Sequence, residues 1–181
     1  PYLPIDPSDI GREYEPVVRI NSQSGKGGVA FVMDTFYGFK LPKGMHKEFA
    51  DVIQKIAEVQ GEVAPEQIME NFKTSYLSAK EPFNFIRCET IDVGGEGGES
   101  DTRCKLTFKY RSSIEVVESE GNGPIDAVRN GIYKRTGIDV KVLDYSEHAL
   151  SSGSHASAAA YVHLMDNVTG RATYGVGVSA N

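Results

Sequence analysis

The chain has 181 residues, of which 40% are hydrophobic and 24% are charged, and its formal net charge at pH 7 is −6. This length and composition suffice for one well-packed core or two small ones. The acidic balance and the lack of a Lys/Arg cluster argue against a nucleic-acid partner, whose phosphates a basic surface would meet. No apolar run approaches the ~20 residues of a membrane span, and the N-terminus does not resemble a signal peptide. We therefore expect a cytoplasmic protein with no membrane partner.

The N-terminal segment, residues 1–21, is rich in proline and is predicted to be a linker. The glycine-rich stretch NSQSGKGG that follows has the wrong spacing for a phosphate-binding P-loop. Ile20 stands where that motif needs its first glycine, and Gly27 stands where it needs Ser or Thr. The dinucleotide fingerprint G-x-G-x-x-G does not fit either. The stretch therefore predicts a turn into a helix and not a nucleotide site.

Residues 22–80 predict a small helical module. Apolar residues recur at helical spacing from residue 45 to residue 56, and Gly61 follows as a stop signal. A further helix begins at Pro65, a residue suited to the first helical position. We expect both apolar stripes to form core and not ligand contacts. The stripes are Met45, Phe49, Val52, Ile53 and Ile56 in the first helix, and Ile68, Met69, Phe72, Tyr76 and Leu77 in the second.

The hydrophobic period changes to two after Pro82. Residues 83–92, 104–110 and 112–118 predict three strands, and the glycine-rich residues 94–101 predict a flexible connection. A helix is predicted from Pro124 to Gly137, with Ile125, Val128 and Ile132 on one face.

The two cysteines of the chain, Cys88 and Cys104, fall in two of these predicted strands. They form no C-x-x-C pair. We expect buried, reduced thiols and not a disulfide or a metal site.

The strand pattern then begins again. Residues 138–150, 155–165 and 171–178 predict three more strands, and a second helix would be expected from about Ser179. The predicted fold class is α+β: a helical linker subdomain followed by a duplicated β-β-β-α domain with pseudo-two-fold symmetry, whose last helix is absent.

Catalytic and metal-binding patterns are missing from the sequence. His46, His148, His155 and His163 have no metal-ligand spacing around them, and Ser151, Ser152 and Ser154 have no G-x-S-x-G context. We expect no catalytic residue, no metal site and no cofactor in this chain.

A small-molecule site is nevertheless indicated between residues 121 and 158. A G-x-G turn that opens a helix can present backbone N–H groups to a carboxylate. Aliphatic and small residues that could line an apolar hole beside it are Ile125, Val142, Ala149, Ala156 and Ala158. An ordinary core with alanines at close strand contacts is the alternative.

Several stretches closely resemble the C-terminal part of the 2-isopropylmalate synthase family. They are PYLPIDPSDIGREYEPVVRINSQSGKGG, FADVIQKIAE, GNGPIDAV, VLDYSEHALSSGSHASAAAYV and YGVGVSAN, and the resemblance covers nearly the whole chain. It implies an acyltransferase whose (β/α)8 barrel condenses acetyl-CoA with 2-oxoisovalerate, using a divalent metal. This chain would then hold residues 1–21 as a linker, 22–80 as a helical linker subdomain and 83–181 as the regulatory domain. Without the barrel, we expect it to be inactive.

The resemblance also implies that L-leucine binds as a feedback inhibitor at a homodimer interface. The implied leucine-binding residues are Gly121, Asn122, Gly123, Ile125, Val142, Tyr145, Ala149, Ala156, Ala158 and Val178. Asp144 is a weaker candidate for holding the amino group. Tyr14 resembles a tyrosine between regulatory and catalytic parts, which implies signal transmission, with plain linker packing as the alternative. Lys26 would lie near the active-site mouth of the intact enzyme.

Two other interpretations stay open. The chain could be a citramalate synthase-type regulatory domain that binds isoleucine, or a dimerisation module without a ligand. A nucleotide-binding enzyme would rest on the SGKGG stretch alone.

Overall fold

A computed structural model of the chain describes residues 19–21, 25–78, 81–94, 100–151 and 156–180. The predictions for Tyr14, Ser152, Ser154 and His155, and for most of the linker at residues 1–21, concern residues outside this part. Within it, helices and antiparallel sheets occupy separate stretches of the chain, so the predicted α+β class is confirmed.

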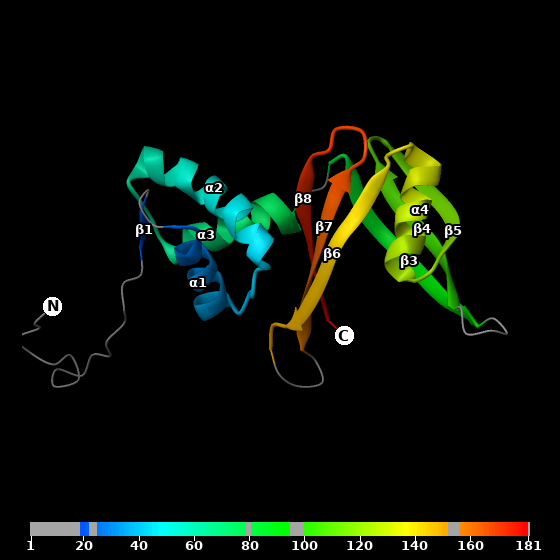
Figure 1. Cartoon of the computed structure of the whole chain (residues 1–181), viewed down its shortest axis with the longest axis horizontal. Helices are drawn as coiled ribbons and strands as arrows, with labels where there is room; N and C mark the ends of the chain where they lie inside the picture. Colours follow the sequence, from blue (N-terminus) through cyan, green and yellow to red (C-terminus); the bar gives the residue numbers. More distant parts are fainter. Residues whose placement is uncertain (1–18, 22–24, 79–80, 95–99, 152–155, 181) are drawn as a thin grey trace, which may run out of the picture.

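The helical module lies on one side of the molecule (Figure 1). Its elements are β1 (Ile20–Asn21), α1 (Lys26–Tyr37), α2 (Lys43–Gln60), β2 (Glu62–Val63), α3 (Pro65–Phe72) and a π-helical continuation, Lys73–Leu77. Helix α1 begins directly after Gly25 and ends at Gly38, whose φ of 73° is left-handed. The helix predicted to follow this glycine-rich stretch is thus confirmed, while residues 22–24 of the predicted turn lie outside the described part. The short antiparallel pairing of β1 with β2, which the sequence pattern does not indicate, fixes the chain ahead of α1.

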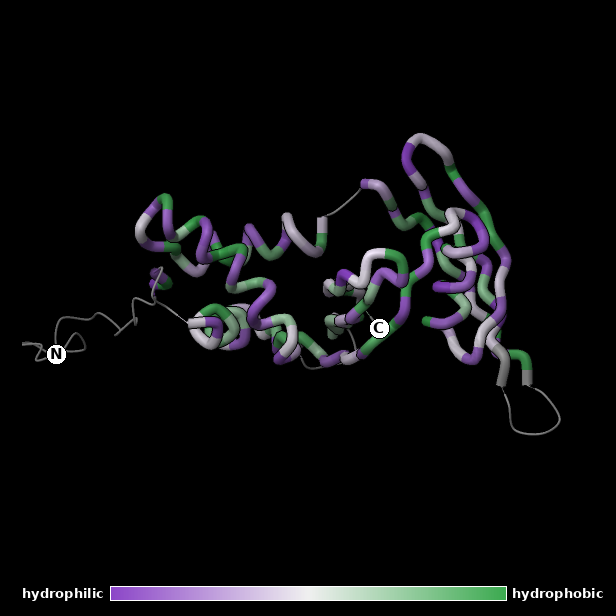
Figure 2. The backbone as a smooth tube through the Cα atoms, turned by 45° about the horizontal axis from the view of Figure 1, so that its top comes forward, coloured by the Kyte–Doolittle hydropathy of each residue, from purple (hydrophilic) through white to green (hydrophobic). Residues whose placement is uncertain are grey.

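The predicted apolar stripes meet in one core. Phe72 is fully buried at its centre, with ring centroids 5.0 Å from Phe39, 5.3 Å from Phe49 and 5.3 Å from Tyr76. The rest of both stripes packs in or against this cluster, as predicted. Figure 2 shows how hydrophobic and hydrophilic residues alternate along these helices.

The remainder of the chain forms sheets and one further helix. The first sheet has the antiparallel order β3-β4-β5, with β3 (Phe83–Gly94), β4 (Ser100–Tyr110) and β5 (Ser113–Gly121). Helix α4 (Pro124–Thr136) follows it in the chain. The second sheet has the antiparallel order β6-β7-β8, with β6 (Val140–Ala149), β7 (Ser157–Asp166) and β8 (Ala172–Ala180). Each predicted strand is confirmed. The pseudo-two-fold duplication and the second helix stay predictions.

Helix α4 covers the first sheet. Cys104, Leu106, Phe108, Val117 and Ala127 are buried together in this second core. Gly131 makes the close approach possible, because a methyl group there would lie 2.8 Å from Ser119 Oγ. The opposite face of the sheet is exposed.

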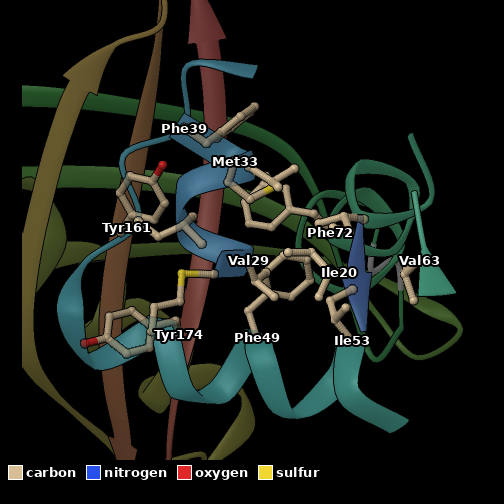
Figure 3. Packing of buried hydrophobic residues seen from close by; sticks show 14 of the residues in the cluster. Ile20, Val29, Met33, Phe39, Phe49, Ile53, Val63, Phe72, Tyr161 and Tyr174 are labelled. Carbon is tan, nitrogen blue, oxygen red and sulfur yellow. The ribbon is translucent and has the colours of Figure 1, made fainter. Parts of the chain in front are cut away.

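The second sheet is covered by the helical module. Ala159, Tyr161 and Tyr174 belong to the same core as Phe49 and Phe72. Figure 3 shows Tyr161 and Tyr174 projecting from β7 and β8 toward the helices, with Met33 and Phe39 beside them. The core therefore crosses the boundary between residues 22–80 and 83–181 that the sequence indicates.

Polar contacts fix the module on this sheet. Glu48 Oε1, on α2, accepts hydrogen bonds from Tyr76 Oη at 3.0 Å, Thr173 Oγ1 at 3.1 Å and the Tyr174 amide at 3.4 Å. His148 Nε2, on β6, accepts one from the Lys40 amide at 3.1 Å. Burial, reinforced by Glu48, raises the pKa of the Tyr76 hydroxyl above its ordinary value, so Tyr76 stays a donor.

Phe72→Ala should lower the free energy of unfolding by about 3 to 5 kcal/mol, because it empties the centre of the aromatic cluster. Val59, on the same module, is 87% exposed, so Val59→Ala is the matched control and should stay within about 0.5 kcal/mol of the parent. Urea unfolding followed by circular dichroism measures both. A loss for Phe72→Ala no larger than the control's would contradict this core.

The β7–β8 hairpin predicts an acid dependence. Asp166 Oδ1 accepts hydrogen bonds from the Thr169 amide at 2.8 Å and the Val168 amide at 2.7 Å, and these hold the pKa of Asp166 below its ordinary value. Because the folded pKa is the lower one, the stabilisation is complete above the unfolded pKa of about 3.9 and is lost as the pH falls through the folded value. Asp166→Asn should make the free energy of unfolding depend less on pH between the folded and unfolded pKa values of Asp166. An NMR titration that gives Asp166 an ordinary pKa would refute the hairpin contacts.

Candidate functional site

The loop between β5 and α4 begins the candidate site. Gly123 is extended (φ −179°, ψ 174°) and Pro124 is the first residue of α4, as the sequence predicts. The helix start carries no side-chain cap; instead Asp126 Oδ2 turns back to accept a hydrogen bond from the Asn122 amide at 3.3 Å. A helix start of this kind favours a negatively charged group nearby.

An open groove of about 550 Å³ joins this loop to the start of β6. Its lining residues are Asn122, Gly123, Pro124, Ile125, Asp126, Arg129, Lys141 and Val142. Ile125 and Val142 supply aliphatic surface, while Asp126, Arg129 and Lys141 supply charges of both signs. Arg129 Nε lies 3.6 Å from Asp126 Oδ1, and both side chains are more than one-third exposed. The groove thus offers an apolar surface beside an acid and two bases, which suits a small zwitterion with an aliphatic side chain.

Four of the predicted leucine-binding residues line this groove: Asn122, Gly123, Ile125 and Val142. Gly121 lies directly behind it, because a methyl group at this position would come within 2.5 Å of the Ala127 amide nitrogen in the first turn of α4. The structure therefore brings the G-x-G turn and the start of β6 together, although about 20 residues separate them in the chain.

Three more predicted residues share the sheet face of Val142, which we call the groove face. Val142 pairs with Leu164, Tyr145 with Val162, and Ala149 with Ala158, so these side chains point the same way. A β-bulge between Val142 and Asp144 puts Val142 and Tyr145 in phase despite their odd spacing. Tyr145 is 42% exposed, and its hydroxyl donates to Glu147 Oε2 at 2.5 Å, which raises the pKa of Tyr145 above its ordinary value.

Val178 and Asp144 lie on the opposite face of the second sheet. Val178 pairs with Ala159, and Asp144 pairs with His163, so both lie on the face of the second sheet that packs on the helical module. The bulge explains the position of Asp144, because the extra residue puts its side chain on the opposite face from Val142. Ala156 is half-buried just before β7.

Sequence reasoning missed the charged residues of the groove. Asp126, Arg129 and Lys141 are not among the candidate residues that the sequence indicates. The spacing of Asp126 and Arg129, three residues apart on a helix, could have suggested a pair facing the G-x-G turn. Nothing in the sequence indicates that Lys141 joins them.

Of the described histidines, His46 hydrogen-bonds through Nε2 to the Leu41 carbonyl at 2.9 Å, and the other two stack on tyrosines. The ring of His163 stacks on Tyr174 at a centroid distance of 4.2 Å, and that of His148 stacks on Tyr161 at 5.7 Å. Among the residues that the structure describes, no group of three or more His, Cys, Asp or Glu side chains is placed to hold a metal ion. Within the same ranges, no helix has the length and apolar character of a membrane span. Lys26 is exposed at the start of α1.

Comparison with known proteins matches both ends of the chain. Residues 62–181 match the LeuA allosteric (dimerisation) domain, and residues 1–34 match the post-catalytic domain-like region of alpha-isopropylmalate synthase.

Relatives that share the whole length of the chain carry one name, 2-isopropylmalate synthase. The protein of Rhodospirillum rubrum is 40% identical over 184 residues, covering 100% of this chain and 32% of its own length. That of Mycobacterium ulcerans is 43% identical over 183 residues, covering 99% of this chain and 31% of its own. That of Clostridium acetobutylicum is 40% identical, covering 100% and 32%. The chain thus spans about a third of the length of these relatives.

Two glycines of the G-x-G turn give a matched test of this geometry. Gly121→Ala should lower the free energy of unfolding by about 1 to 3 kcal/mol, because the added methyl group would meet backbone atoms of Asp126 and Ala127 at 2.8 and 2.5 Å. Gly123→Ala should change it by less than about 0.5 kcal/mol, since no heavy atom lies within 4 Å of the new methyl group. Urea unfolding of the two variants decides, and equal losses would contradict the close approach of β5 to α4.

Proposed function

The chain belongs to the LeuA allosteric (dimerisation) domain family, and we propose that it is the regulatory part of a 2-isopropylmalate synthase, in which it binds L-leucine as a feedback inhibitor. The observation that supports this most directly is the groove, where Ile125 and Val142 lie beside Asp126, Arg129 and Lys141. Leucine combines an aliphatic side chain with one negative and one positive charge, and the groove offers a counterpart to each.

We assign the ligand groups by charge. The carboxylate of leucine lies at the start of α4, where the helix dipole, Arg129 and Lys141 favour a negative group. The ammonium lies against Asp126, which replaces Asp144 as the candidate acid. The isobutyl group contacts Ile125 and Val142. The predicted residues Tyr145, Ala149 and Ala158 lie farther along the groove face, beyond the groove itself. Gly121, Asn122 and Gly123 shape the turn that holds the carboxylate.

Dimerisation completes the proposal. The groove is open to solvent in a single chain, and an open groove leaves much of a small ligand hydrated. A second copy packed over it would exclude that water, which agrees with the predicted homodimer interface. Ala156 and Val178, which do not line the groove of their own chain, could then only contribute from such a partner or act in packing.

Inhibition follows by linkage. Leucine that binds one state of the dimer better than another lowers the activity of the catalytic part through a coupling free energy of about 1 to 3 kcal/mol, a 5- to 150-fold effect. In the parent protein, acetyl-CoA and 2-oxoisovalerate would be condensed in a separate domain that holds the divalent metal. This chain has no catalytic role in that scheme; Tyr14 and Lys26 would lie on the route between the two parts.

Isothermal titration of the chain with leucine, isoleucine and valine tests the proposal. Leucine should bind most tightly, and Asp126→Asn should weaken its binding about tenfold or more, because the ammonium loses a charged partner. Asp51→Asn is the matched control: Asp51 is an exposed acid on α2, paired with Lys47 at 2.7 Å and outside the groove, so its removal should leave the affinity unchanged.

Each other result selects an alternative. Tighter binding of isoleucine than of leucine would favour the citramalate synthase type. A folded chain that sediments as a dimer but gives no heat with any of the three amino acids would identify a dimerisation module without a ligand. If Asp51→Asn and Asp126→Asn weakened leucine binding equally, the groove would not be the leucine site.

A further inference from the structure

The two cysteines lie against each other under α4. Cys88 on β3 is opposite Leu106, and Cys104 on β4 is opposite Thr90, so the cysteines are diagonal neighbours on the same sheet face. Their sulfur atoms are 3.5 Å apart. A disulfide requires an S–S distance of about 2.05 Å, so rotation of the side chains together with a small shift of the strands would close the bond.

The two thiols differ in access. Cys104 is 2% exposed within the core between β4 and α4, whereas Cys88 is half-buried near its margin. Burial, above all, raises the pKa of Cys104 to about 11, with Cys88 adding to the shift and the neighbouring Ser119 opposing it. Cys88 is therefore the thiol that a soluble oxidant meets first, and Cys104 is the protected partner.

We propose that Cys88 and Cys104 form a redox site, in which a peroxide oxidises Cys88 and Cys104 then closes a disulfide with it. The Cys88 thiolate attacks the O–O bond of hydrogen peroxide, takes up one oxygen as sulfenic acid and releases hydroxide. The sulfur of Cys104 then attacks the Cys88 sulfur, loses its proton and expels the oxygen as water. The sum is two thiols plus one peroxide giving one disulfide plus two waters. A thiol reductant then reduces the disulfide back to the two thiols.

The site is connected to the groove. Cys104 on β4 lies directly opposite Ser119 on β5, and Ser119 Oγ donates a hydrogen bond to the Ala127 carbonyl at 2.6 Å. Ala127 is fully buried in the first turn of α4, directly after the groove residues Ile125 and Asp126. A disulfide draws the Cys104 sulfur toward Cys88 and so changes the packing of Cys104 beside its cross-strand neighbour Ser119. Oxidation should therefore change how α4 presents its first turn to an amino acid; this part of the inference rests on the proposed function.

Intact mass spectrometry of the folded chain tests the redox site. After hydrogen peroxide treatment, unfolding and alkylation, the chain should have lost two hydrogen atoms and should take up no alkyl group, and prior reduction should restore two alkylatable thiols. Cys88→Ser and Cys104→Ser are the matched controls, since neither can lose the two hydrogens. A chain that keeps both thiols, gains only separate oxygen atoms, or links to a second chain instead would overturn the proposal.

A glutathione redox buffer supplies a second measurement on the unmutated chain. If the fold brings the sulfurs together, the folded chain should hold a larger disulfide fraction than the chain in guanidinium at the same glutathione ratio. A smaller fraction in the folded chain would show that the fold opposes the bond.

Leucine titration of the reduced and oxidised chains tests the connection to the groove. We expect the Kd to differ by about fivefold or more. An unchanged Kd would refute the connection, and no binding to either form would refute the proposed function while leaving the mass result intact.

Discussion

The burial of Tyr161 and Tyr174 among the helices is the contact on which the arrangement of the molecule depends. A sheet of three antiparallel strands has two faces, and at least one must be covered to offset the entropy of ordering the chain. Helix α4 does this for the first sheet. For the second sheet the helical module does it, with Ala159 and both tyrosines entering the core around Phe72. The module and the second sheet therefore stabilise each other, and their shared core is incomplete without either part.

This shared core leaves the other face of the second sheet free of the helical module. Once Ala159 and Tyr161 face the helices, the alternation of the strands sends Ala158 and Val162 the opposite way. The bulge after Val142 then lets the start of β6 approach α4 without disturbing the end that carries His148. The groove thus arises from two constraints: the module decides which face is free, and the bulge decides which β6 residues reach the helix start.

Local features of this fold could be predicted from the sequence, and long-range ones could not. Pro124 and Gly137 mark both ends of α4 through backbone chemistry that acts within a few residues. Period-two patterning likewise identifies the strands, but it says only that one face is buried and not what buries it, so the joining of Tyr174 to the helical core was missed. Nothing local marks Leu143 as the extra residue of a bulge, so the sequence does not indicate which face of the sheet Asp144 occupies. Asp126 and Lys141 line the same groove only because separate elements pack together.

Strand β6 connects the groove at one of its ends to the helical module at the other. Its first residues, Lys141 and Val142, line the groove, and its penultimate residue, His148, holds the amide of Lys40 between α1 and α2. A hydrogen-bonded strand resists bending, because every residue of β6 other than Leu143 is paired with β7. A ligand that repositions the start of β6 must therefore either strain the bond to Lys40 or carry the helical module with it. In a regulatory domain the second outcome is the useful one, since it converts binding at one end of a strand into movement at the surface of another subdomain.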